Sequence, residues 1–448
     1  VDPLHHLVPA EEYLDVLTPA TARRALDALG GEYPEQTLLE MVAWYEGVGL
    51  RADARALLAL GWQAGLPEVS ISGGLTGPGA DAGRRFSANP LLQAWRGYLS
   101  RDPTAQGGDE DPAFLSMEPD LSFSFPYRPE SLPVLRWASR ASGNWVWKYL
   151  LALNLWALDR DQEAGEILAS LGQEPDYGPF YVTRGLLLQD ILEADPRADL
   201  QRGVALDPEN RVLHIYLLRH LQDAGDWAPS LEAVREAKER FPEDFTLDLM
   251  EAKALINLGA PREAAKLLAD TQVLPSENGR ESHLLWEQAH TLAGLSALEA
   301  GAAASARRDL LLAMEWPEHL GQGRPYQPEE RLPRFLLGMA EDALGHEEEA
   351  AGAYRAVVDG TPGLARALAH GPEAPIPGLG SGLDLLAISA LERLGQEEDV
   401  EHLLRSWDTA MEEIMEGLDG DLGGAMILRT LRLSSGPLGL VGGREMTP

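Results

Sequence analysis

Histidine side chains are the first candidates for chemistry in this sequence. His283 and His290 lie seven residues apart in a segment with helical periodicity, so both fall on one face of the helix. Two imidazoles on one face could begin a metal site, but the pattern supplies no third ligand, and a core histidine is the commoner case. For His5 and His6, close to the first residue, we expect solvated side chains and not metal ligands. We therefore predict no metal site.

The motifs that hold phosphates, nucleophiles or calcium are missing or incomplete. The sequence contains no GxxxxGK[ST], no GxSxG and no HExxH. Asp419-Gly420-Asp421 starts like a calcium loop, but its twelfth position is Thr430, where a bidentate glutamate is needed. The glycine-rich stretch 378–382 follows no strand, which argues against a dinucleotide site. We predict no cofactor and no catalytic residue.

Composition excludes further classes. The 448 residues include 71 acidic and 37 basic ones, and the formal net charge of −34 argues against nucleic acid or an anionic membrane as a partner. So many acids leave no carboxylate pair that can be singled out for glycoside chemistry. The absence of cysteine excludes disulfides and thiolate sites, and no apolar run reaches the roughly 18 residues of a membrane helix. Because the first residue is Val1, we expect a processed or partial chain. For the location of the protein, we slightly favour the cytoplasm.

A repeat of about 34 residues organises the sequence. Prolines recur at intervals of 33, 34 and 33 residues, at Pro175, Pro208, Pro242 and Pro275. Between them, apolar residues fall on one helical face, a glycine breaks the pattern, and a second amphipathic segment follows. A well-preserved copy carries Leu336, Leu337, Gly338, Gly345, Ala350, Tyr354, Val357 and Pro362. The small residues would let two helices cross closely while large ones fill the space between pairs.

This pattern resembles the tetratricopeptide repeat (TPR) family. The likeness is strong over 145–362 and extends to 35–67 and 380–407. It departs from the family at Glu251, where an apolar residue is expected, and at Pro196, where a small one is expected. The resemblance implies an all-α fold, a right-handed TPR-like helix-turn-helix solenoid with irregular loop insertions.

Irregular stretches suggest the domain limits. We expect N-terminal helical repeats over 1–142 with long loops at 65–89 and 101–129, a core TPR array over 143–362, a C-terminal helical pair or pairs over 363–433, and a flexible tail over 434–448. Glycine- and proline-rich stretches at 317–328 and 370–382 are further insertions. The first of these lengthens one repeat to 45 residues, from Pro317 to Pro362.

A narrower resemblance comes from four segments, 144–158, 174–185, 273–290 and 316–331, together with 2–7 and 125–138. They look like the C-terminal, TPR-containing half of large bacterial proteins whose N-terminal domain, of unknown function, is carbohydrate-linked. That likeness implies that a catalytic or sugar-binding part is missing from this chain. Whether the chain is part of a glycoside-processing enzyme stays open.

The TPR resemblance also implies a concave groove formed by the first helix of each pair. In that register the groove residues with side chains suited to binding are Tyr149, Trp156, Arg219, Gln222, Asp223, Lys253 and Asn257. Such a groove would hold a peptide, a partner domain, the chain's own N-terminal domain or a second copy. The tryptophans near residue 147 leave carbohydrate as an alternative ligand. The predicted function is therefore a protein-interaction scaffold, with an accessory part of a carbohydrate-active enzyme or a sugar-binding module as alternatives.

Overall fold

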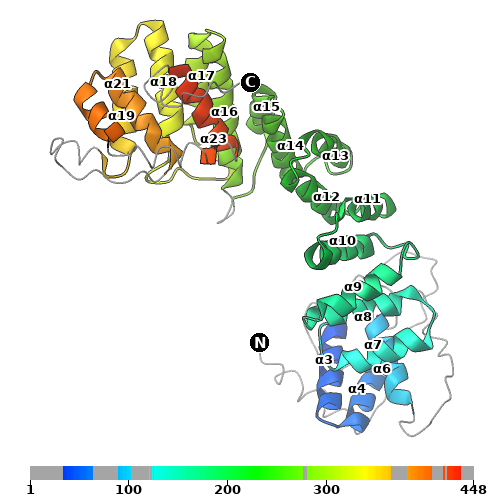
Figure 1. Cartoon of the computed structure of the whole chain (residues 1–448). Helices are drawn as coiled ribbons and strands as arrows, with labels where there is room; N and C mark the ends of the chain where they lie inside the picture. The colour runs from blue at the N-terminus through cyan, green and yellow to red at the C-terminus, as the bar shows by residue number, and fades with distance from the viewer. Residues whose placement is uncertain are drawn as a thin grey trace. The chain divides into compact units, whose positions relative to one another are not determined.

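The computed structural model describes residues 34–63, 89–101, 121, 124, 126–275, 280–364, 381–405, 417–418 and 421–434. All regular secondary structure in these ranges is helical, which confirms the predicted all-α class. The chain divides into two compact units, Val1–Leu213 and His214–Pro448. In each unit, successive helices run back alongside one another as hairpins (Figure 1), the arrangement expected of TPR-like repeats.

Unit 1 is built from eight described helices, each packed on its neighbour in the chain. They are α3 (Pro34–Gly47), α4 (Arg51–Gln63), α6 (Pro90–Ser100), α7 (Ser131–Ala141), α8 (Trp145–Ala157), α9 (Asp161–Ser170), α10 (Gly178–Leu192) and α11 (Arg197–Leu206). One hydrophobic core runs through this unit, and its largest fully buried side chains include Trp95, Trp147 and Phe180.

Unit 2 continues the same design. Its described helices are α12 (Arg211–Asp223, which spans the division), α13 (Trp227–Arg240), α14 (Phe245–Asn257), α15 (Pro261–Asp270), α16 (Glu281–Glu299), α17 (Ala303–Ala313), α18 (Arg331–Leu344), α19 (Glu347–Gly360), α21 (Leu385–Arg393) and α23 (Leu422–Ser434), with short 3-10 turns η2 (Glu318–Leu320) and η3 (Gly382–Asp384). No helix in the described part of the chain is long and apolar enough to cross a membrane.

The turns inside the hairpins are made by the glycines that break the sequence pattern. Gly225, between α12 and α13, has φ 73°, and Gly345, between α18 and α19, has φ 76°. This left-handed backbone costs glycine little and is strained for other residues, so it ends the first helix of each pair cheaply.

Small residues bring the two helices of a hairpin close together, as predicted. A Cβ atom on Gly338 of α18 would lie 2.6 Å from the ring of Tyr354 on α19, and one on Gly294 of α16 would lie 2.6 Å from Leu310 on α17. Between α10 and α11 the two backbones themselves come close, because a Cβ on Gly178 would lie 2.8 Å from the backbone oxygen of Gly203. Side chains at these positions would force the helices apart.

The two departures from the family pattern have structural explanations. Glu251 replaces an apolar residue, and its buried carboxylate accepts hydrogen bonds from Lys238 Nζ at 2.6 Å and from Arg235 Nε at 2.9 Å. Pro196 replaces a small residue at the start of α11, where Gly185 on α10 makes room for it, since a Cβ there would lie 3.1 Å from the proline ring.

Several predicted segments fall largely outside the described residues, namely most of 65–89, 101–129 and 370–382 and all of the tail except Ser434. The insertion at 317–328 is described. It is irregular except for η2, as predicted, and hydrogen bonds join it to neighbouring segments. Val273 N donates to His319 O at 2.8 Å, and Ser282 Oγ donates to Leu320 O at 2.8 Å. The predicted domain limits stay predictions.

Candidate functional site

The two groove candidates in unit 1 lie on α8 and differ in exposure. Tyr149 is 5% exposed, its ring meets that of Phe180 edge-on at 5.6 Å, and its hydroxyl lies 3.3 Å from Thr183 Oγ1. Burial raises the pKa of Tyr149, more than the hydrogen bond with Thr183 lowers it. Trp156 is partly buried against the same core. In this structure Tyr149 therefore packs between helices, and Trp156 keeps a partial surface.

The tryptophans that suggested a sugar-binding face are largely interior. Trp137 is 8% exposed and Trp147 is 1% exposed. Trp145 is partly buried and stacks on Tyr177 with ring centres 6.4 Å apart. A sugar ring needs an open aromatic face to stack on, and these indoles are used mainly to join helices.

On α12, the three groove candidates separate into one buried and two exposed side chains. Gln222 is 6% exposed and donates through Nε2 to Met250 O at 2.9 Å and Ser230 Oγ at 3.2 Å, so it ties α12 to α13 and α14. Arg219 and Asp223 are exposed, one helical turn apart, and no ion pair joins either of them to another described residue. They are free to contact a partner.

The α14 candidates are also one turn apart. Lys253 and Asn257 are both partly buried, and Asn257 Nδ2 donates to Lys253 O at 2.8 Å. Lys253 Nζ lies 3.7 Å from Glu281 Oε1 at the start of α16. We call Arg219, Asp223, Lys253 and Asn257 the polar strip. These residues retain accessible polar atoms, and they all belong to unit 2.

The two histidines of α16 are buried and pack against aromatic rings. His283 and His290 are each 6% exposed. His283 stacks on Trp316 with ring centres 3.3 Å apart, and its Nε2 lies 3.1 Å from Glu315 O. His290 meets the ring of Trp286 at 4.3 Å. Burial lowers the pKa of both imidazoles and favours their neutral forms. In the described ranges no group of three or more potential ligands could hold a metal ion.

Sequence reasoning missed Glu287, which lies between these histidines on α16. Burial, together with the negative charges of Glu329 and Glu330, raises the pKa of its carboxyl group to about 7. The two neighbouring acids lie between the insertion at 317–328 and the start of α18. Because that contact depends on how the insertion folds back, helical periodicity alone could not reveal it. A carboxyl group with a pKa close to 7 can gain or lose a proton near neutral pH, so it is a candidate for a pH-dependent property of the protein.

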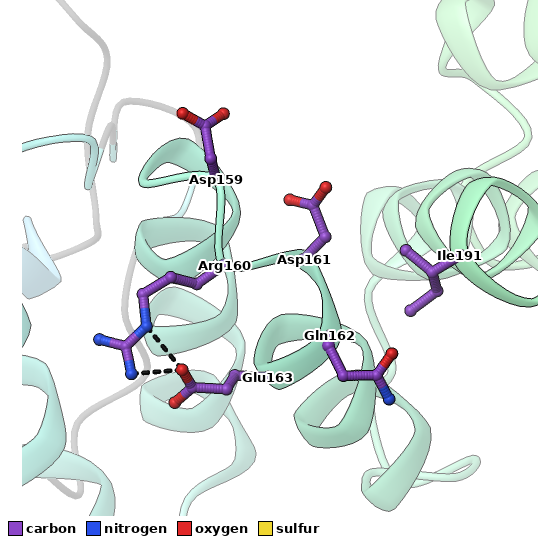
Figure 2. Close-up of a pocket in the computed structure, with 6 residues that line it drawn as sticks. All are labelled: Asp159, Arg160, Asp161, Gln162, Glu163 and Ile191. Carbon is purple, nitrogen blue, oxygen red and sulfur yellow. Dashed lines mark hydrogen bonds and ion pairs between the residues drawn. The ribbon is translucent and has the colours of Figure 1, made fainter.

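A surface pocket of about 440 Å³ lies at the α8–α9 turn (Figure 2) and extends to Ile191 on α10. Its polar lining is Asp159, Arg160, Asp161, Gln162 and Glu163. Arg160 Nε donates to Glu163 Oε1 at 2.6 Å, while the carboxylates of Asp159 and Asp161 extend away from this pair. The lining is acidic, and it contains no serine, cysteine or histidine.

A second pocket of about 330 Å³ lies between the end of α6 and α7. It is basic and aromatic, and its lining residues are Tyr98, Arg101, Leu132, Pro133, Arg136, Trp137 and Arg140. We call it the arginine pocket. Its members lie at 98–101 and 132–140, about 30 residues apart in sequence, so no short sequence motif contains them.

Comparison with known proteins leaves the function open. No family model and no curated protein matches the chain. Among solved structures, yeast Tom70 is 14% identical over 97% of this chain and 88% of its own, with a TM-score of 0.27. A chain of the APC/C hetero-tetramer Cut9–Hcn1 is 14% identical over 96% of this chain and 96% of its own, with a TM-score of 0.30. Human IFIT1 in complex with m7Gppp-AAAA is 14% identical over 93% of this chain and 95% of its own, with a TM-score of 0.25. Superpositions this loose assign no function, and the TPR-like description rests on the helix hairpins themselves.

Proposed function

We propose that this chain is a protein-interaction scaffold that binds a peptide or partner domain through the polar strip of unit 2. The observation that carries the proposal is the contrast on α12. Gln222 is enclosed and serves the packing, whereas Arg219 and Asp223 on the same helix reach solvent without an ion-pair partner in the described residues.

The α14 half of the polar strip supports the same conclusion. Among the described residues, the one ion pair of Lys253 is a long contact of 3.7 Å with Glu281, an exposed side chain. A surface pair of this kind contributes little to stability, so an incoming carboxylate or backbone carbonyl could displace it at small cost. The partly buried Lys238, by contrast, is held by two carboxylates at 2.6 Å each.

A peptide or protein is favoured over carbohydrate because Trp137, Trp145 and Trp147, which suggested a sugar-binding face, pack mainly between helices. The narrower resemblance to bacterial proteins with a carbohydrate-linked N-terminal domain stays a prediction. On that resemblance the occupant would be a preceding domain of the same protein. A second copy of the chain is the other candidate.

A selection from a random-peptide library tests the proposal. Peptides enriched on the wild-type chain are synthesised and measured by calorimetry against Arg219→Ala and Lys253→Ala. Matched controls are Arg355→Ala on α19 and Lys266→Ala on α15, both exposed side chains of the same unit. We expect the strip variants to bind about tenfold more weakly, since a hydrogen bond to a charged group contributes roughly 1.5–3 kcal/mol.

The two controls should bind within about twofold of wild type, and all four variants should melt within a few degrees of it. Enriched peptides that bind the strip variants and the wild type equally well would show that the groove lies elsewhere. Tight binding of oligosaccharides in the same calorimeter, with no enriched peptide, would favour the sugar-binding alternative.

A further inference from the structure

The arginine pocket of unit 1 gathers like charges in a chain that is strongly acidic overall. Arg136 and Arg140 lie four residues apart on α7, and Arg101 approaches from the end of α6. None of the residues that line the pocket is acidic. The sequence nevertheless contains 71 acidic residues against 37 basic ones, so this chain has many carboxylates that could have neutralised the arginines.

Aromatic rings hold Arg101 in place. Its guanidinium carbon lies 4.4 Å from the ring centre of Tyr98 and 5.0 Å from that of Trp137. These rings meet edge-on at 6.2 Å, and Trp137 is largely buried. A cation held over ring faces keeps its N–H donors free for another group. The rings therefore fix the position of the Arg101 guanidinium, and no hydrogen bond joins its N–H groups to another residue in the described part of the chain.

The two arginines of α7 are only weakly neutralised. Arg136 Nη2 lies 3.5 Å from Glu163 Oε2, a pair in which both side chains are more than 40% exposed. Arg140 is exposed, and no ion pair joins it to another described residue. Like charges one helical turn apart repel, and the third cation adds to that repulsion. An anion bound between them would relieve it.

We propose that the arginine pocket binds an acidic segment of a partner protein, whose carboxylates pair with Arg101 and Arg140 and whose apolar side chain packs on Leu132 and Pro133. Planar guanidinium groups match carboxylates in a bidentate geometry. The apolar lining favours a peptide over a bare inorganic anion. At physiological salt the Debye length is about 8 Å, so the negative charge of distant surfaces is largely screened at the pocket. This site is separate from the polar strip and does not depend on it.

The test uses fluorescein-labelled synthetic peptides in which several glutamates flank one leucine or phenylalanine, measured by fluorescence polarisation with the full chain at about 0.15 M salt. Peptides with glutamine in place of glutamate report on charge. We expect the acidic peptides to bind with Kd below about 100 μM and the glutamine versions at least about tenfold more weakly.

Arg140→Gln is the main variant because its side chain is exposed and its loss should leave the fold intact. Arg101→Gln is the second variant. Arg202→Gln on α11, another exposed arginine of unit 1, changes the net charge equally. Both pocket variants should lose at least about tenfold in affinity, with the control unchanged. Equal binding by all three variants would overturn the proposal. So would the absence of binding by any acidic peptide, or equally strong competition by inorganic phosphate.

Discussion

The close crossing of α18 and α19 makes a sharp prediction about Gly338. A Cβ atom on Gly338 would lie 2.6, 2.8 and 2.9 Å from three ring carbons of Tyr354, closer than real Cβ contacts allow. The ring has little room to move, because it is 1% exposed, packs against Phe335 at 5.5 Å, and donates its hydroxyl hydrogen to Asp342 Oδ2 at 2.7 Å. Gly338→Ala must therefore shift one helix relative to the other.

Two opposing effects set the magnitude. Alanine is favoured over glycine inside a helix by about 1 kcal/mol. Overpacking a dense core costs about 1–3 kcal/mol, and the three short contacts place this site in the upper part of that range. We expect Gly338→Ala to lower the free energy of unfolding by about 1–2 kcal/mol, and Gly338→Leu to lower it by several kcal/mol.

Gly352 on α19 is the matched control. It also lies within a helix, but a Cβ there would meet nothing within 4 Å. Gly352→Ala should therefore stabilise the protein by about 0.5–1 kcal/mol. The difference between the two alanine variants isolates the clash from helix propensity.

Urea unfolding followed by circular dichroism gives the overall free energy, and native-state hydrogen exchange of the amides in α18 and α19 reports on this hairpin alone. The local measurement is needed because two compact units need not unfold together. If Gly338→Ala were as stable as the wild type while Gly352→Ala was stabilised as expected, the close-crossing argument would be refuted.

Two further predictions concern ionisable groups. Because the folded-state pKa of Glu287 is raised from 4.5 to about 7, the folded protein retains a proton that the unfolded chain releases, and stability falls as pH rises through that window. Glu287→Gln should thus stabilise the protein relative to wild type at pH 8 by on the order of 2 kcal/mol and much less near pH 4, and an equal difference at both pH values in urea titrations would contradict the assignment. Burial raises the pKa of Glu251, but hydrogen bonds from Lys238 and Arg235 outweigh it, and the net pKa is lowered. Its stabilising contribution is present above the unfolded pKa and is lost as pH falls through the lowered folded pKa. Lys238→Met should cost about 1–2 kcal/mol at pH 7, since Arg235 still pairs with Glu251, and less in acid, whereas a cost independent of pH would mean that the ion pair is not its source.

Sequence periodicity predicts the scaffold well because close helix crossing demands small residues at fixed places. Gly338 and Gly294 show this, since each lies against a large side chain of the following helix. The turn glycines follow for the same reason, because a left-handed backbone restricts the residue type. These constraints act between residues that are close in sequence, so they recur about every 34 residues and can be recognised from the sequence alone.

Individual surface positions are harder to predict because the face of a helix does not determine burial by itself. Gln222 and Asp223 are adjacent groove candidates, yet one is enclosed by α13 and α14 and the other is exposed. Tyr149 is enclosed in the same way by rings from α10 and the segment before it. The burial of each side chain depends on the neighbouring repeat and on the length of the side chains that this repeat presents. A register transferred from a family contains no information on either.

The distribution of arginines links the fold to the proposed binding site. In unit 2, buried carboxylates pair with arginines of other helices. Glu341, 3% exposed, forms an ion pair with Arg307, and Asp309, 7% exposed, forms one with Arg262. Such pairs remove the penalty of an isolated buried charge. Arg101 and Arg140 have no comparable carboxylate in the described part of unit 1, although they share a pocket walled by aromatic and apolar side chains. If their function were only to stabilise helices, neutral substitutions at both positions should lower the melting temperature and leave every binding measurement unchanged. A loss of acidic-peptide binding at constant melting temperature is the opposite pattern, and it is the one that the geometry predicts.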